Sequence, residues 1–159
     1  MKKIWWLVIL FLVAMESCMA VQSEVAKPVV FGDVPSPEEW APGDKVAYLV
    51  VTDKNWSTYY SSPPKGSDFA TYIYVVASLG MKPNPGYRVK ILQIQQEKEK
   101  ITVKVELGEP DPKKFYAQVM VYPIAVAEIP KTNLQKFDLL NFIFTDQKGR
   151  EIASVKTEI

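Results

Sequence analysis

The chain has 159 residues, 48% of them apolar, so its length and composition fit one folded domain with a sizeable core. A formal net charge of +1 argues against nucleic acid or an anionic membrane surface as a partner, because both attract proteins with a basic excess. The sequence has no histidine and a single cysteine, which excludes an internal disulfide and the commonest general base and metal ligand.

The first twenty residues predict a signal peptide for export. Lys2 and Lys3 precede an uncharged apolar run over residues 4–15, which suits a signal peptide and is shorter than the roughly 20 residues that span a bilayer. We expect cleavage after Ala20, or lipoprotein-type cleavage before Cys18, which would then carry a lipid anchor. The anchor is favoured because a lone thiol is a liability in an oxidising compartment. The protein is therefore expected at the cell envelope, or free in the periplasm or outside the cell.

Residues 21–44 predict a Pro-rich linker between the signal peptide and the domain. Their prolines and glycines are scattered, and only Ser36 to Glu39 has the order of a capped helical turn, with Ser at the N-cap and Pro at the first helical position. We expect this stretch to act as a tether, with a β-rich domain over residues 45–159.

The first part of that domain alternates buried strands with turns. The β-branched apolar run at 45–52 predicts a buried strand, and Thr52 or Asp53 is the expected N-cap of a short amphipathic helix that follows. The prolines of 62–66 end this helix, and the run at 71–79 predicts a second buried strand.

The middle of the domain predicts a β-hairpin. Apolar and polar residues alternate from Tyr87, and the alternation shifts phase at Leu92, which indicates a bulge or bend in the strand. The polar run at 96–100, QEKEK, forms the expected turn, and 101–105 form a strand with one wet face. The prolines of 108–112 then require a loop, because proline has no N–H to donate to a sheet.

The last part predicts further strands. Residues 115–129 are extended in character, with a bend or sheet edge at Pro123, and 131–140 is a helical turn or a loop. Residues 142–145 and 151–157 flank a polar turn and predict a terminal hairpin. Six or seven strands at short spacing indicate a mainly β fold: a small antiparallel β-sandwich or open barrel with one short helix.

No residue pattern in the chain points to catalysis, a cofactor or a metal. Acidic residues lie in turns and on polar strand faces rather than as a spaced pair. Ser61, Ser62 and Ser67 flank a Pro/Gly turn without an S-x-x-K or G-x-S-x-G motif, and the glycines are scattered singly. We therefore expect a protein that is not an enzyme and that binds no cofactor or metal.

Two stretches resemble a known family. Residues 80–91, GMKPNPGYRVKI, resemble the G-x-K-P-x-G-G-Y-x-V-x-I signature of the PrcB C-terminal domain of a protease complex subunit. Residues 118–123 and 129–131 resemble the second block of that family, Q-x-x-x-Y-P followed by I-P-K, and the likeness spans roughly 70–131. Pro85 departs from the signature, since it replaces the first glycine of a Gly-Gly pair and fixes φ at about −65°.

The resemblance implies an exported envelope β-domain that associates with a surface peptidase complex as an accessory, stabilising or regulatory subunit. A protein partner is therefore expected, a secreted or surface peptidase first, with contact to the membrane only through a lipid on Cys18. The candidate protein-binding residues are Lys82, Pro83, Asn84, Pro85, Gly86, Tyr87, Tyr122 and Pro123.

Two other functions stay open from the residues. The segment Asn84-Pro85-Gly86-Tyr87 resembles the N-P-x-x-G-Y loop of chagasin-type cysteine-peptidase inhibitors but is two residues shorter, so an inhibitor acting through Pro83 to Tyr87 is an alternative. A structural or carbohydrate-binding envelope domain is another. It depends on aromatic residues that core packing also explains: Trp40, Trp56, Tyr59 and Tyr60.

Overall fold

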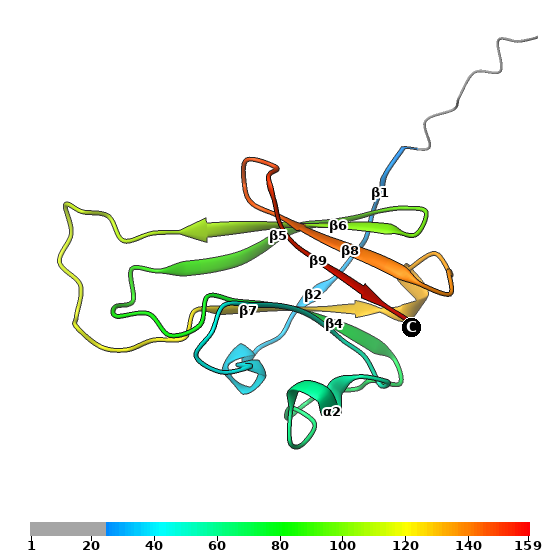
Figure 1. Ribbon diagram of the computed structural model, residues 1–159, viewed down its shortest axis with the longest axis horizontal. Helices are drawn as coiled ribbons and strands as arrows, with labels where there is room; N and C mark the ends of the chain where they lie inside the picture. Colours follow the sequence, from blue (N-terminus) through cyan, green and yellow to red (C-terminus); the bar gives the residue numbers. More distant parts are fainter. Residues whose placement is uncertain (1–24) are drawn as a thin grey trace, which may run out of the picture.

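The computed structural model describes residues 25–159 as two β-sheets packed face to face (Figure 1). The expected signal peptide and Cys18 lie outside the described residues. The part that is described confirms a mainly β fold with one short helix, and it has the two layers of a sandwich.

The strands fall into one sheet of five and one of four. The five-stranded sheet has the order β1 (Lys27–Pro28), β5 (Arg88–Glu97), β6 (Lys100–Gly108), β8 (Leu140–Thr145) and β9 (Glu151–Thr157). The four-stranded sheet has the order β2 (Gly32–Asp33), β7 (Ile124–Pro130), β4 (Tyr72–Ser78) and β3 (Ala47–Val51). Three short helical elements complete the described chain: η1 (Pro37–Trp40), α2 (Trp56–Tyr59) and η2 (Lys131–Asn133).

The strand pairing is antiparallel with one exception. β6 and β8 run parallel, with Lys100 opposite Asn141 and Lys104 opposite Thr145. The chain reaches β8 after crossing to the other sheet through β7, and this long connection permits parallel pairing that a tight hairpin does not. The expected antiparallel sandwich therefore needs this correction.

The position of β4 inside the four-stranded sheet explains why its sequence is apolar at nearly every position. Ile73, Val75 and Ala77 face the other sheet and join the main core, whereas Tyr74 and Val76 belong to a second apolar cluster. Both faces of β4 are thus covered, so alternation with polar residues is absent. Helix α2 lies below the four-stranded sheet in Figure 1 and contributes to the second cluster.

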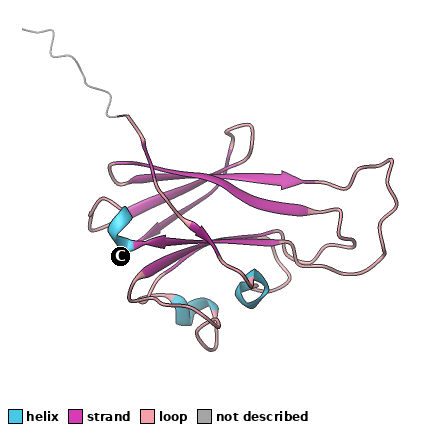
Figure 2. Cartoon of the chain, turned by 180° about the vertical axis from the view of Figure 1, so that it is seen from behind, coloured by secondary structure: helices cyan, strands magenta, loops and turns pink. Residues whose placement is uncertain are grey.

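The described part of the expected linker, residues 25–44, packs on the domain. β1 pairs with β5 and β2 pairs with β7, so this segment runs from one sheet to the other along their edges (Figure 2). Trp40 at the end of η1 is fully buried, and its ring centroid lies 4.2 Å from that of Tyr74. A coil tether does not describe these residues, because their strand pairing and Trp40 are part of the fold.

Three local expectations also need comment. The expected bulge in β5 is present, as a register shift between Ile91 and Gln93, and Leu92 within it is exposed. α2 follows Asn55 instead of Thr52 or Asp53, and the Asn55 side chain accepts a hydrogen bond from the Thr52 N–H at 2.8 Å. The extended stretch expected at 115–129 forms a strand only from Ile124, where pairing with β4 begins.

Candidate functional site

Two long loops meet at one end of the sandwich and extend beyond the strands (Figure 1). They are the β4–β5 loop, residues 79–87, and the β6–β7 loop, residues 109–123. We call the two loops together the loop platform. Every residue that the sequence singled out for protein binding lies in it.

Backbone hydrogen bonds join the two loops. The Lys82 N–H donates to the Val121 carbonyl at 2.8 Å, and the Val121 N–H donates back to the Lys82 carbonyl at 2.9 Å. The Leu79 N–H donates to the Pro123 carbonyl at 2.9 Å. These bonds extend the β4–β7 pairing past the sheet, so the base of the platform is held by the sandwich itself.

Gly86 is where the two loops touch most closely. It is buried, and a Cβ placed on it would lie 2.7 Å from the Pro110 Cβ and 2.9 Å from the Tyr116 Cε1. Real Cβ atoms essentially never approach other heavy atoms below 3.0 Å, so only glycine fits here without a shift. The structure thus brings the β4–β5 loop and the segment around Pro110 together at this point.

The tip of the β4–β5 loop is shaped by its own side chains. The Gly86 N–H donates to the Asn84 Oδ1 at 3.0 Å, which closes a tight turn around Pro85. The Lys82 Nζ lies 5.4 Å from the centre of the Tyr87 ring, within the range of a cation–π contact. Pro83 and Pro85 are exposed. The loop therefore presents two rigid prolines on a turn that is fixed from below.

Tyr122 ties the platform to the segment that precedes β3. Its hydroxyl lies 3.0 Å from the Asp44 Oδ1 and 3.5 Å from the Met81 Sδ. The hydrogen bond to Asp44 raises the pKa of the Tyr122 phenol, so the phenol stays protonated as a donor. The Met81 N–H also donates to the Asp44 carbonyl at 3.0 Å.

Large apolar side chains are exposed on the platform. Phe115 is fully exposed, and Met120 is 58% exposed. With three others they make five exposed large apolar residues on these two loops: Met81, Phe115, Val119, Met120 and Tyr122. Exposed large apolar side chains that lie close together usually mark an interaction surface, so these five residues make the platform the candidate surface for a partner.

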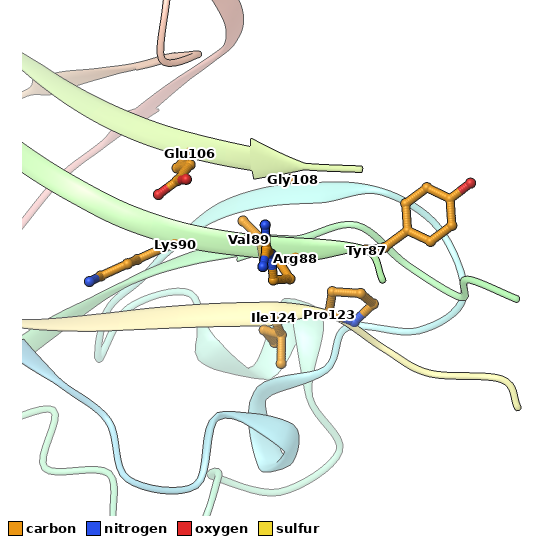
Figure 3. Close-up of a pocket in the computed structure, with 8 residues that line it drawn as sticks. All are labelled: Tyr87, Arg88, Val89, Lys90, Glu106, Gly108, Pro123 and Ile124. Atoms are coloured by element: carbon orange, nitrogen blue, oxygen red, sulfur yellow. The ribbon is translucent and has the colours of Figure 1, made fainter. Parts of the chain in front are cut away.

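A groove opens beside the platform, between the edges of the two sheets (Figure 3). Its volume is about 550 Å³, and Arg88, Val89 and Lys90 of β5 line one side while Pro123 and Ile124 line the other. Tyr87 stands at the platform end of the groove in Figure 3. The groove exists because β1 and β2 pair only with the far parts of β5 and β7.

A second hollow, of about 910 Å³, lies at the opposite end of the sandwich, around η2 and the C-terminus. Its Lys131 Nζ lies 3.3 Å from the Asp53 Oδ1, and its Lys54 Nζ lies 3.5 Å from the Glu158 Oε2. Lys131, from the second sequence block, is thus far from Tyr122 and serves an ion pair. The preceding Ile129 is fully buried in the core.

The described part of the chain contains no cluster of three or more His, Cys, Asp or Glu side chains that would suit a metal ion. In the same residues, no helix is long and apolar enough to cross a membrane. The arrangement at the platform is one of apolar side chains, prolines and backbone bonds, which suits contact with another macromolecule.

A match to a known protein family covers the stretch that contains the platform. Residues 73–130 match the PrcB C-terminal family model. This confirms the resemblance for that stretch, which begins in β4, ends with β7 and includes both platform loops. No curated protein and no solved structure matches the chain.

Sequence reasoning missed the exposed apolar residues of the β6–β7 loop. The extended character of residues 115–129 predicts a strand, whereas the structure has a loop up to Pro123. Pro110, Pro112 and Pro123 were the available signal, because three prolines within 14 residues make a continuous paired strand unfavourable. Phe115 lies between two of these prolines, and no sequence pattern marks it.

Proposed function

We propose that this protein is an exported, non-enzymatic partner of another exported protein, which it binds through the loop platform and thereby stabilises or regulates. The observation that carries the proposal is the gathering of five exposed large apolar residues on two loops that are joined by backbone hydrogen bonds. Aromatic and methionine side chains of this kind dominate the buried centres of protein interfaces.

The construction of the platform favours binding in a second way. Ordering a loop on association costs free energy, and a loop that is already held pays less of it. The Lys82–Val121 bridge, the Gly86 contact and the Tyr122–Asp44 bond all hold the loops before any partner arrives. The exposed apolar residues are therefore supported by a fixed base.

A peptidase is the first partner to test. The support is the family match, since PrcB is a subunit of a protease complex and the matched residues 73–130 contain both loops. Two rigid, exposed prolines at Pro83 and Pro85 also support an inhibitory contact as a second form of the same interaction. A titration against papain-like and subtilisin-like peptidases separates the two, because an accessory subunit leaves their rates unchanged at micromolar protein.

Site-specific photo-crosslinking in the native envelope tests the proposal. A photoreactive residue is placed at Phe115 on the platform, and the matched control is placed at Phe137, an exposed phenylalanine at the opposite end of the sandwich. We expect one dominant adduct from position 115, identified as an exported protein by mass spectrometry, and none at the same mass from position 137. Equal adducts from both positions, or none from either, would refute binding through the platform.

The site of attachment is tested separately by the mass of the mature protein. Cleavage before Cys18 with diacylation and cleavage after Ala20 give clearly different masses. We propose the anchored form, which would hold the sandwich at the envelope surface and leave the platform free to meet a partner there.

A further inference from the structure

We propose that the groove between β5 and β7 binds an extended segment of a partner protein as an added strand on β5, with acidic residues at alternate positions. This site is separate from the exposed apolar residues of the platform. It does not depend on which protein the platform binds, and it rests on the backbone and charge of the groove.

The open edge of β5 has hydrogen-bonding groups to offer. The Leu107 N–H and carbonyl both bond to the Gln147 side chain, at 3.2 Å each, so they point away from β5. Leu107 is opposite Val89, so the two residues form a non-hydrogen-bonded pair of the antiparallel ladder. The N–H and carbonyl of Val89 therefore point to the open edge, and by the same alternation so do those of Ile91.

The rest of this edge is already used for strand pairing. The Val29 N–H donates to the Ile94 carbonyl at 2.9 Å, and β1 pairs with Gln95 and Gln96. The chain then crosses to β2 on the other sheet. Among residues 25–159, no strand pairs with this edge between Arg88 and Ile91. The edge of β5 therefore pairs with β1 at Gln95 and Gln96 and is open between Arg88 and Ile91.

The opposite wall belongs to the other sheet. The Val34 N–H donates to the Val126 carbonyl at 3.1 Å, and the Pro123 carbonyl faces β4. Backbone groups of successive residues point to opposite sides of a strand. The N–H and carbonyl of Ile124 therefore point, like the Val126 carbonyl, away from β4 and toward the groove. An inserted strand would therefore lie between Val89 and Ile124, with every second side chain against these apolar residues. Its length is set by residues 87–91, about 17 Å at about 3.4 Å per residue.

The positive charge of the groove favours an acidic strand as its occupant. Arg88 and Lys90 are exposed on the β5 wall, and no ion pair within 4 Å involves either of them among the described residues. Glu106 is opposite Lys90 on β6, so the groove carries a net positive charge. A second copy of this edge would place Arg88 and Lys90 against their own counterparts, and like charges opposite each other destabilise strand pairing. An added strand with acidic residues at these positions places opposite charges there instead.

A peptide-binding experiment with the full chain tests the proposal. The probe is a fluorescein-labelled seven-residue peptide of alternating Val and Glu, compared with one of alternating Val and Lys. We expect the Val/Glu peptide to bind at least about tenfold more tightly, because its two ion pairs with Arg88 and Lys90 become repulsions in the Val/Lys peptide. Hydrogen exchange at the Val89 and Ile91 amides should slow only when the Val/Glu peptide is present.

Two variants and a control make the result specific. In the double variant Arg88→Glu with Lys90→Glu, the preference should reverse toward the Val/Lys peptide. Val89→Pro removes an N–H that points away from β6, so it should weaken binding about tenfold while β5 stays paired. The control variant Lys156→Glu lies on β9, the outer strand of the same sheet, and should change neither the preference for the Val/Glu peptide nor its affinity.

Four results would overturn the proposal. One is that neither peptide binds below about 1 mM. Another is that binding occurs but is insensitive to both groove variants. Amides of Val89 and Ile91 that are already protected without peptide would show that the chain's own residues before 25 fill the edge. A concentration-dependent dimer that is lost in the Val89→Pro variant would show that a second copy does.

Discussion

Replacing Gly86 with alanine tests whether the two platform loops are locked together. The added Cβ would lie 2.7 Å from the Pro110 Cβ, 2.9 Å from the Pro110 Cα and 2.9 Å from the Tyr116 Cε1. Two of these atoms belong to a proline, which cannot rotate away, so the loops must separate. Gly86 does not have a positive φ, so backbone strain does not add to the effect. Overpacking of this kind costs about 1–3 kcal/mol of unfolding free energy.

The matched control is Gly32→Ala in β2. There the new Cβ would meet only the Glu128 side chain, at 3.1 Å from its Oε1, and that flexible carboxylate can move. Urea unfolding followed by tryptophan fluorescence measures both variants, and two-dimensional NMR reports whether resonances of Tyr116 and Lys82 shift. We expect a loss of about 1–3 kcal/mol and shifts in both loops for Gly86→Ala, with less than about 0.5 kcal/mol for the control. Equal stability of the two variants, with unshifted loop resonances, would refute the close packing of the loops.

Two further predictions concern parts outside the platform. Trp40→Ala should cost about 3–5 kcal/mol in urea unfolding, because it empties a fully buried site, and Trp40→Phe should cost less because the indole N–H makes no hydrogen bond that could be lost; a neutral Trp40→Ala would restore the tether interpretation of residues 25–44. Asp146→Asn tests a carboxylate whose pKa is lowered below 3.8, chiefly by the Arg150 backbone N–H and then by its guanidinium. Because the folded pKa is lowered, the wild type should exceed the variant in stability at pH 7, and the difference should shrink as the pH falls below 3.8. A difference that stays constant in urea unfolding down to pH 2.5 would contradict this linkage.

The strands were predictable where local sequence determines pairing. The hairpin of β5 and β6 has alternating residues on both sides of a charged turn, and the structure places Lys98 in that turn with φ of 55°. The terminal hairpin, with Asp146 and Gly149 in its turn, is similar. In both hairpins the partner strand comes next in the sequence, so the local residue pattern is enough to predict the pairing.

Pairing between distant segments was not predictable in the same way. β1 and β2 have two residues each, which is too short for a periodic signal, and they form because β5 and β7 present edges to them. The parallel pairing of β6 with β8 depends on the route of the chain through the other sheet. Trp40 follows the same logic, since its burial depends on Tyr74 and Phe69, about 30 residues further along the chain.

The candidate site was predictable in part. The signature around Lys82 to Tyr87 located one loop, and the Tyr122-Pro123 pair located the end of the other. The exposed side chains of Phe115 and Met120 were not predictable, because the same residues in a paired strand would have been covered. The distinction requires knowing that pairing with β4 stops at Ile124.

The most direct test of the central claim is the affinity of this protein for the partner that photo-crosslinking at Phe115 identifies. Calorimetry should compare the wild type with the double variant Phe115→Asp with Met120→Asp, and with the matched control Phe137→Asp with Leu139→Asp at the opposite end. If the platform is the binding surface, the platform variant should weaken binding at least about 30-fold, or 2 kcal/mol, as expected for interface hot spots. The control should bind as the wild type does. Wild-type affinity in the platform variant, or an equal loss in the control, would contradict the account.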